Sequence, residues 1–171
     1  MRQQARRGLI LGLMAMAAAH ASPAMAANNV VTVSATVAKP LILTWVQDLD
    51  LGTVVPAPGT WSGAVVSISK AGVFSCLNVN ITCSGATQVA KYNVSGTNNR
   101  IVLISAPNVT LTNQSDPSQT LTMIVDNPLA VTLTNSGPPG TDFSLGGSVT
   151  ITSATPGGTY VGTFDVTVDY Q

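Results

Sequence analysis

The chain has 171 residues, of which 8% are charged, and its formal net charge at pH 7 is zero. All seven acidic residues are aspartates and His20 is the single histidine, so glutamate acid/base pairs, histidine-dependent triads and zinc sites lack their usual side chains. Three of the seven basic residues fall within the first seven positions, which leaves no basic patch for nucleic acid elsewhere. The composition therefore predicts a non-catalytic protein with no cofactor, no metal and no nucleic-acid partner.

The N-terminus has the pattern of a signal peptide over residues 1–26. Three arginines precede the apolar run 8–19, and Ala24-Met25-Ala26 has the small-x-small spacing of a cleavage site. This run is too short for a transmembrane helix, although an uncleaved membrane anchor is the alternative interpretation. We predict cleavage after Ala26, loss of His20 with the signal, and export of a single domain, 27–171. Four basic residues and seven aspartates then leave a formal charge of −3.

The remainder of the chain consists of short runs of Val, Ile, Leu and Thr separated by Gly, Pro, Asn, Asp and Ser. Such runs at this spacing are typical of an all-β sandwich or barrel. We expect strands at 30–39, 41–46, 49–55, 64–69, 73–77, 88–95, 101–105, 109–112, 121–125, 129–134, 148–152 and 159–170.

The first expected strand, Val30–Lys39, has one apolar face close behind the predicted cleavage site. The side chains that share this face are Val31, Val33, Ala35 and Val37. A free strand of this kind exposes valines and unpaired backbone groups to water, so it must pair with its own sheet or with another subunit.

The only two cysteines, Cys76 and Cys83, are predicted to form a disulfide because export leads to an oxidising compartment. Their spacing suits a tight hairpin around Val79-Asn80 that places the two cysteines opposite each other. A redox pair is the alternative, but the spacing is not Cys-x-x-Cys and no cationic neighbour lowers a thiol pKa.

Two tryptophans and two aspartates near the start of the domain are candidate binding residues. Trp45 and Trp61 can stack on sugar rings, but buried core is the expected place for them in a domain with few aromatic residues. Asp48 and Asp50 share one side of an expected strand, yet a calcium site needs several more oxygen ligands. We interpret this pair as a solvated strand end.

The C-terminal segment Thr159–Tyr170 is predicted to be one long strand with a buried face and a polar face. Asp165 and Asp169 lie on the polar face, where charge protects a sheet edge from aggregation. The apolar face comprises Tyr160, Gly162, Phe164, Val166, Val168 and Tyr170.

Three segments carry a resemblance: VTVSATV at 31–37, QDLDLGT at 47–53 and GTYVGTFDVTVDY at 158–170. With these segments the chain resembles a bacterial exported β-sandwich domain family of unknown function. That family is in turn similar to spore coat protein U domains and to chaperone–usher pilins.

The pilin resemblance implies an immunoglobulin-like sandwich that lacks its final strand, in a bacterial protein that passes through the periplasm to the cell surface or the medium. A periplasmic chaperone fills the gap first, and the N-terminal segment of the next subunit replaces it at an outer-membrane usher. The implied donor residues are Val31, Val33, Ala35 and Val37. The implied groove residues are Gly157, Tyr160, Phe164, Val166, Val168 and Tyr170.

The resemblance implies a structural subunit of a surface fibre or coat whose partners are other copies of itself or related subunits. One departure is that related chains carry an early cysteine where residues 38–41 read AKPL, so their disulfide register does not transfer. The main alternative is a complete, monomeric binding or adhesion module in which 30–39 belongs to its own sheet. An enzyme that relies on Asp, Lys or Tyr alone is the second alternative.

Overall fold

The computed structural model describes residues 32–171, so the predicted signal peptide, its cleavage site, Val30 and Val31 lie outside the described residues. Within 32–171 the chain forms thirteen β-strands and no helix, which confirms the all-β prediction. Residues 36–171 make one compact unit. Residues 32–35, described separately, are exposed and belong to no strand.

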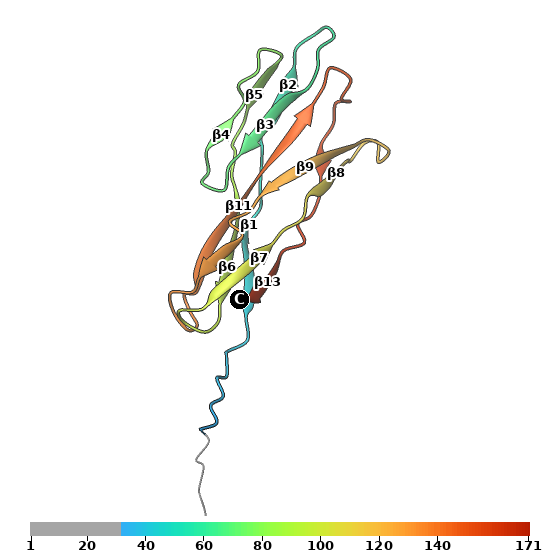
Figure 1. The fold of residues 1–171 in the computed structure, drawn as a ribbon. Helices are drawn as coiled ribbons and strands as arrows, with labels where there is room; N and C mark the ends of the chain where they lie inside the picture. The colour runs from blue at the N-terminus through green and yellow to red at the C-terminus, as the bar shows by residue number, and fades with distance from the viewer. Residues whose placement is uncertain (1–31) are drawn as a thin grey trace, which may run out of the picture. The chain divides into compact units, whose positions relative to one another are not determined.

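The strands assemble into antiparallel sheets that are consistent with a β-sandwich (Figure 1). The largest sheet has the order β1-β6-β11-β9-β8-β12, with β3 also paired to β11 and β4 paired to β3. The other two sheets are β10-β7-β13 and β2-β5. The strand bounds are β1 Ile42–Gln47, β2 Thr53–Pro56, β3 Ala64–Ile68, β4 Phe74–Ser75, β5 Ile81–Ser84, β6 Ala90–Ser95, β7 Ile101–Ser105, β8 Val109–Asn113, β9 Thr120–Asp126, β10 Ala130–Thr132, β11 Thr141–Ile151, β12 Tyr160–Val161 and β13 Thr167–Tyr170.

Strand β11 connects the two halves of the large sheet by changing partners along its length. Residues 141–145 pair with β6, whereas 147–151 pair with β3 and 146–149 pair with β9. The change occurs at Gly146, where an added Cβ would collide with the backbone of residues 68–70. Glycine is therefore needed at this close approach.

The core has two clusters because β11 spans both halves. The first, here called the β6–β7 core, joins the large sheet to the β10-β7-β13 sheet and contains Ala90, Val94, Val102, Ile104, Ala106, Leu133, Phe143 and Leu145. The second contains Ala64, Val66, Ile81, Val109, Met123, Val149 and Ile151. Leu49, Val125 and Phe164 are partly buried and pack against both clusters. Buried and exposed positions alternate along β3 and β7, as expected for strands with one face on a core.

The structure corrects two of the expected strands. Residues 32–39 form no strand and all of them are exposed, with Val33 and Val37 at 89% and 91%. The predicted strand 159–170 is broken into β12, which pairs with β8, and β13, which pairs with β7 in a different sheet. Between the two strands the chain passes close to β8, because a Cβ on Gly162 would lie 2.7 Å from the Thr110 carbonyl oxygen.

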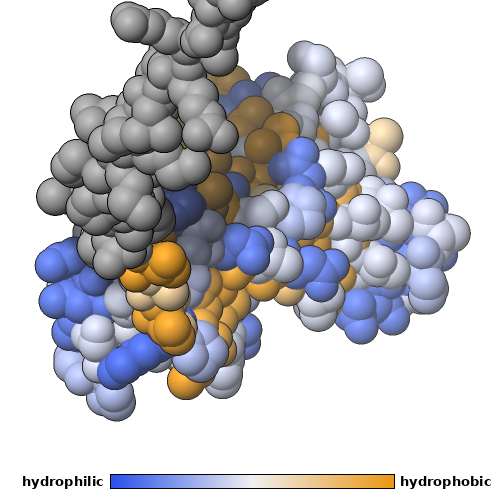
Figure 2. Space-filling view, turned by 60° about the horizontal axis from the view of Figure 1, so that its bottom comes forward, coloured by the Kyte–Doolittle hydropathy of each residue, from blue (hydrophilic) through white to orange (hydrophobic). Residues whose placement is uncertain are grey.

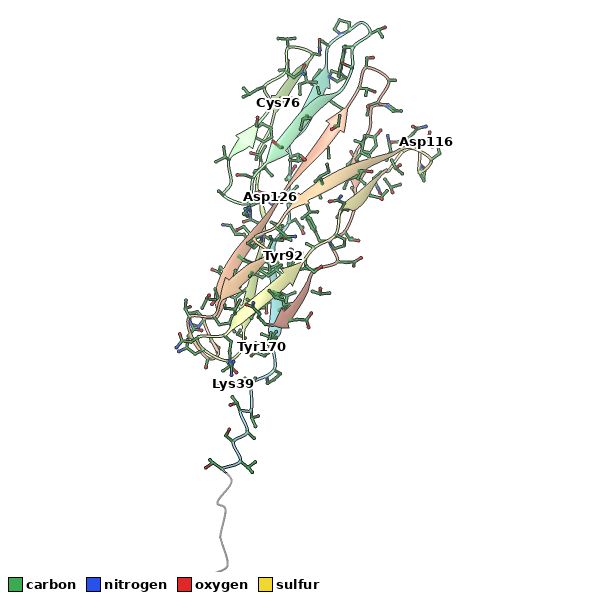
Figure 3. The ribbon with its side chains drawn as sticks, in the orientation of Figure 1. Lys39, Cys76, Tyr92, Asp116, Asp126 and Tyr170 are labelled. Atoms are coloured by element: carbon green, nitrogen blue, oxygen red, sulfur yellow. A yellow bond between two sulfur atoms is a disulfide. The ribbon has the colours of Figure 1, made fainter. Side chains whose placement is uncertain are left out.

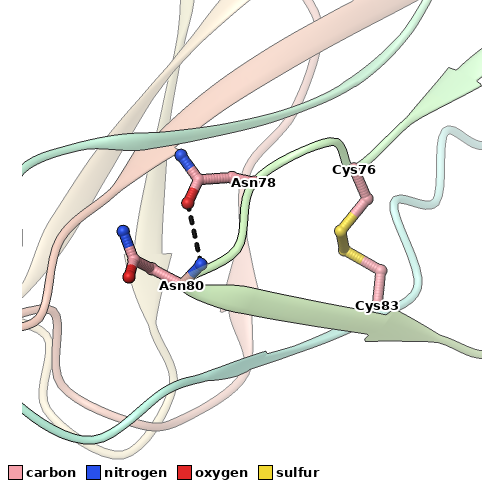
Figure 4. Close-up of a disulfide and its surroundings, with 4 residues drawn as sticks. All are labelled: Cys76, Asn78, Asn80 and Cys83. Carbon is pink, nitrogen blue, oxygen red and sulfur yellow. Dashed lines mark hydrogen bonds between the residues drawn. A yellow bond between two sulfur atoms is a disulfide. The ribbon is translucent and has the colours of Figure 1, made fainter.

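The disulfide between Cys76 and Cys83 is present, with a Cα–Cα distance of 6.3 Å, and it closes the loop drawn in Figure 4. Within that loop the Asn80 backbone N–H donates to Asn78 Oδ1 at 2.9 Å. The expected tight hairpin is wrong, because β4 pairs with β3 whereas β5 pairs with β2. The bond therefore ties together a connection between two sheets.

Candidate strand-docking site

Strands β1 and β13 are edge strands. Among the strands within 32–171, β1 pairs only with β6 and β13 pairs only with β7. Each strand therefore has one edge whose backbone N–H and C=O groups face no neighbouring strand. Such an edge is a template for pairing with another extended chain.

The two edges converge where β1 begins and β13 ends. The Tyr170 hydroxyl donates to the Lys39 carbonyl oxygen at 2.6 Å and accepts from the Thr97 backbone N–H at 2.7 Å. The Lys39 N–H donates in turn to Thr97 Oγ1 at 2.7 Å. We call these three residues the tyrosine clasp; Tyr170 and Lys39 are labelled at this end of the domain in Figure 3.

Side chains of both edges meet next to the clasp. A Cβ on Gly96 would lie 2.8 Å from Leu41 Cδ2 and still closer to the Tyr170 hydroxyl. Because β1 starts at this point and β13 ends at it, the two strands run antiparallel to each other along the β6–β7 core.

The apolar side chains that these edges direct at the β6–β7 core are only partly covered. The core members on the central strands β6, β7 and β11 are at most 5% exposed. The edge members that pack against them are all half-buried: Leu41, Leu43, Phe164, Val166, Val168 and Tyr170. We call these six residues the open-edge cluster. Their partial exposure has a simple cause, because no strand lies beyond either edge within the described chain. Figure 2 shows apolar atoms exposed in a band between polar surfaces on the face that it presents.

Trp45 extends this apolar surface along β1. It pairs across the sheet with Tyr92, which pairs in turn with Phe143, so the three aromatic side chains lie on the same face. Phe143 is 5% exposed and stacks on the half-buried Tyr92 with ring centroids 5.6 Å apart. Trp45 is 59% exposed, so its predicted place in the core is wrong. Because it faces the core side of an edge strand, the missing neighbour of β1 explains its exposure.

A hydrogen bond and nearby charge define the surroundings of this tryptophan. The Trp45 indole N–H donates to Asp48 Oδ1 at 3.0 Å, which restrains the ring. Burial raises the pKa of the Tyr92 hydroxyl, and the negative charge of Asp48 raises it further. The open-edge cluster itself contains no ionisable carboxyl or amino group, whereas Asp165 and Asp169 are exposed on alternate positions, as predicted.

Two predicted groove residues lie elsewhere. Gly157 precedes β12, and its carbonyl oxygen accepts from Asn113 Nδ2 at 3.2 Å. Tyr160 pairs with Asn113 on β8 and its hydroxyl donates to the Pro156 carbonyl oxygen at 2.9 Å. The break at Gly162 separates both from the open-edge cluster. Phe164, Val166, Val168 and Tyr170 do come together, with the alternation of burial that the sequence predicted. The sequence analysis missed Leu41 and Leu43, whose only signal was their apolar alternation before Trp45.

The remaining candidates show no organised chemistry. Within residues 32–171 no group of three or more His, Cys, Asp or Glu side chains is placed to hold a metal ion. Asp48 binds the Trp45 indole, and Asp50 Oδ1 accepts from the Gly52 N–H at 2.8 Å. Trp61 is half-buried beside the second core cluster, and its indole N–H donates to the Ala57 carbonyl oxygen at 3.0 Å. The absence of a cofactor stays a prediction.

Comparison with known proteins gives one match. The family model described as a domain of unknown function, DUF4402, matches residues 41–170. The chain belongs to this family. The match to DUF4402 extends from the residue before β1 through β13, so it includes both open edges and excludes the segment 30–39. No curated protein and no solved structure matched the chain. The similarity to spore coat protein U domains and pilins therefore stays a prediction. No helix within residues 32–171 is long and apolar enough to cross a membrane.

Proposed function

We propose that this DUF4402 protein is a non-catalytic structural subunit of a bacterial surface fibre or coat. In this proposal the segment 30–39 of one copy adds as a strand to the open edges of β1 and β13 of the next copy. Its partners are then copies of itself or related subunits, together with a periplasmic chaperone and an outer-membrane usher. The protein is exported through the periplasm to the cell surface or the medium.

The observation that carries this proposal is that the described chain has both an apolar sheet edge open to an added strand and an exposed segment suited to be one. The open-edge cluster presents half-buried apolar side chains along two unpaired strand edges. The segment 32–39 is apolar on one face, exposed throughout and free of regular structure. Strand addition satisfies both features, because backbone hydrogen bonds form along the edges while alternate side chains fill the space between them.

The expected energy of this docking is large. Each valine that passes from full exposure to full burial contributes roughly 1.5 to 3 kcal/mol. Val33 and Val37 are both close to fully exposed, at 89% and 91%. The backbone pairing adds about 0.5 to 1.5 kcal/mol for each hydrogen bond formed. These gains must exceed the cost of ordering the segment and joining two chains, so stable docking requires most of the apolar face to be buried.

The test is removal of the donor segment from the mature chain. Deleting residues 30–37 spares Lys39 and therefore the tyrosine clasp. We expect the full mature chain to form a series of oligomers, seen as several peaks on size-exclusion chromatography and as a ladder of bands on unheated gels. The deletion should abolish these oligomers. Addition of a peptide covering 30–39 is expected to raise the melting temperature of the deleted chain.

Two matched point variants test whether assembly depends on the apolar face of the segment, which the deletion alone does not show. Val33→Asp places a charge on the apolar face of the segment and should abolish the ladders, because a buried unpaired charge is costly. Ser34→Asp places the same charge on the opposite face and should leave them in place. A mature chain that is monomeric at every concentration, with a melting temperature indifferent to the peptide, would refute the proposal in favour of a self-contained binding module.

A further inference from the structure

The position of Trp45 restricts how an extended strand can lie along these edges. On one face of a strand, successive side chains are about 6.6 Å apart. This face carries Leu43 and Trp45 on β1 and Leu41 directly before it, with Trp45 placed by its pairing with Tyr92. A strand that docks beside β1 must therefore present one side chain at each of these three positions.

The residues across from β1 follow from the clasp. Leu41 and Tyr170 meet at Gly96, and the two strands run antiparallel from there. The three successive rows along the β1 edge are Leu41, Leu43 and Trp45, and the Tyr170 hydroxyl lies beside the first of them.

The third row differs from the other two because β1 presents an aromatic side chain there, Trp45. Its indole is the largest side chain of the β1 edge, and the bond to Asp48 at 3.0 Å restrains it. The predicted donor face offers one small residue among three valines, in the order Val31, Val33, Ala35, Val37. Overpacking a filled site is destabilising, so Ala35 is the residue that suits the third row.

Only one direction places Ala35 there without a penalty elsewhere. A strand parallel to β1 presents Val31, Val33 and Ala35 to rows one to three, and Val37 then lies beyond Trp45. A strand antiparallel to β1 with Ala35 in the third row presents Lys39 to the first row, where a charge would be buried between Leu41 and Tyr170.

We propose that Trp45 sets the register and direction of the incoming strand, with Ala35 of a second copy packed against its indole and the strand parallel to β1. This inference rests on the proposed function and deepens it by naming the residues that set the register and the direction of the donated strand. A chain's own segment departs from the clasp at Lys39, beside Leu41, so folding back along β1 gives the antiparallel direction. The rows therefore favour a donor from another copy over closure by the chain's own segment.

Cysteine pairs that leave Trp45 in place test the register. Residues in adjacent strands lie close enough for a disulfide when they are directly opposite. Mature chains carrying Val33→Cys are mixed with chains carrying Leu43→Cys under mild oxidation, denatured by heating without reductant and separated on a gel. We expect a strong heterodimer band from this pair. Ala35→Cys and Val37→Cys, each mixed with Leu43→Cys, report the shifted and reversed registers and should give weak bands.

A size exchange tests the role of the indole. Ala35→Phe should reduce ladder formation by roughly tenfold or more, from the overpacking cost at the third row. Trp45→Ala in the same chain should restore the ladders. Thr36→Phe, on the opposite face, is the matched control and should have little effect.

The outcomes separate the two proposals. A stronger band from the Ala35→Cys or Val37→Cys mixture, or no rescue by Trp45→Ala, would overturn the register while strand donation stands. No band from any mixture, in a protein whose ladders are lost on deletion of 30–37, would also overturn the register alone. Ladders that survive the deletion of residues 30–37 would refute both strand donation and the proposed register.

Discussion

The tyrosine clasp gives the sharpest test of the described geometry, through the substitution Tyr170→Phe. This change keeps the ring in the open-edge cluster and removes only the hydroxyl, which makes hydrogen bonds of 2.6 and 2.7 Å to the backbone of Lys39 and Thr97. A hydrogen bond contributes about 0.5 to 1.5 kcal/mol to the free energy of unfolding, so the loss of two should cost about 2 kcal/mol. For a domain of this size that corresponds to a fall in melting temperature of roughly 6 °C.

The assay is thermal unfolding of the monomeric fraction of the mature protein, followed by circular dichroism. Tyr160→Phe is a matched control, because the Tyr160 hydroxyl makes a single bond, to the Pro156 carbonyl oxygen, in an exposed loop. It should lower the free energy of unfolding by less than about 1 kcal/mol. Equal melting temperatures for the two variants would refute the assignment of the clasp as the anchor between the end of β13 and the chain before β1.

Three further predictions concern other parts of the domain. The purified protein should resist alkylation at Cys76 and Cys83 until it is reduced, as measured by mass spectrometry, because the disulfide blocks both thiols. In the chain-entropy description this bond stabilises the fold by roughly 2.5 kcal/mol. Two alkylated thiols without reduction would contradict it. Val166→Asp should abolish assembly because it places a charge in the open-edge cluster. Thr167→Asp, at an exposed position, should preserve assembly. Equal loss from both variants would show that the side chains of this segment do not face the core as described. Gly146→Ala should cost more than about 2 kcal/mol in urea unfolding, since the added methyl group collides with backbone, and a neutral result would contradict the close packing of β11 against β3.

Local pattern was sufficient for several features of this protein. Runs of β-branched residues between turn residues predicted an all-β domain, and the structure has strands and no helix within 32–171. The alternation from Phe164 to Tyr170 correctly predicted which side chains face the core. The period of two is a property of the backbone itself, so it can be read without knowledge of the neighbours of a strand.

The partner of each strand was decided only by the tertiary structure. The sequence 159–170 alternates without interruption, yet Tyr160 pairs with β8, whereas Val168 and Tyr170 pair with β7 in another sheet. Trp45 looked like a core residue because it is large and aromatic, and it is exposed because no strand within residues 32–171 pairs with the outer edge of β1. Strand pairing depends on residues far apart in the chain, so local alternation shows that a face is apolar but not what covers it. That is why the apolar faces of 31–37 and 164–170 could both be recognised from the sequence, while the open edges beside β1 and β13 emerged only from the fold.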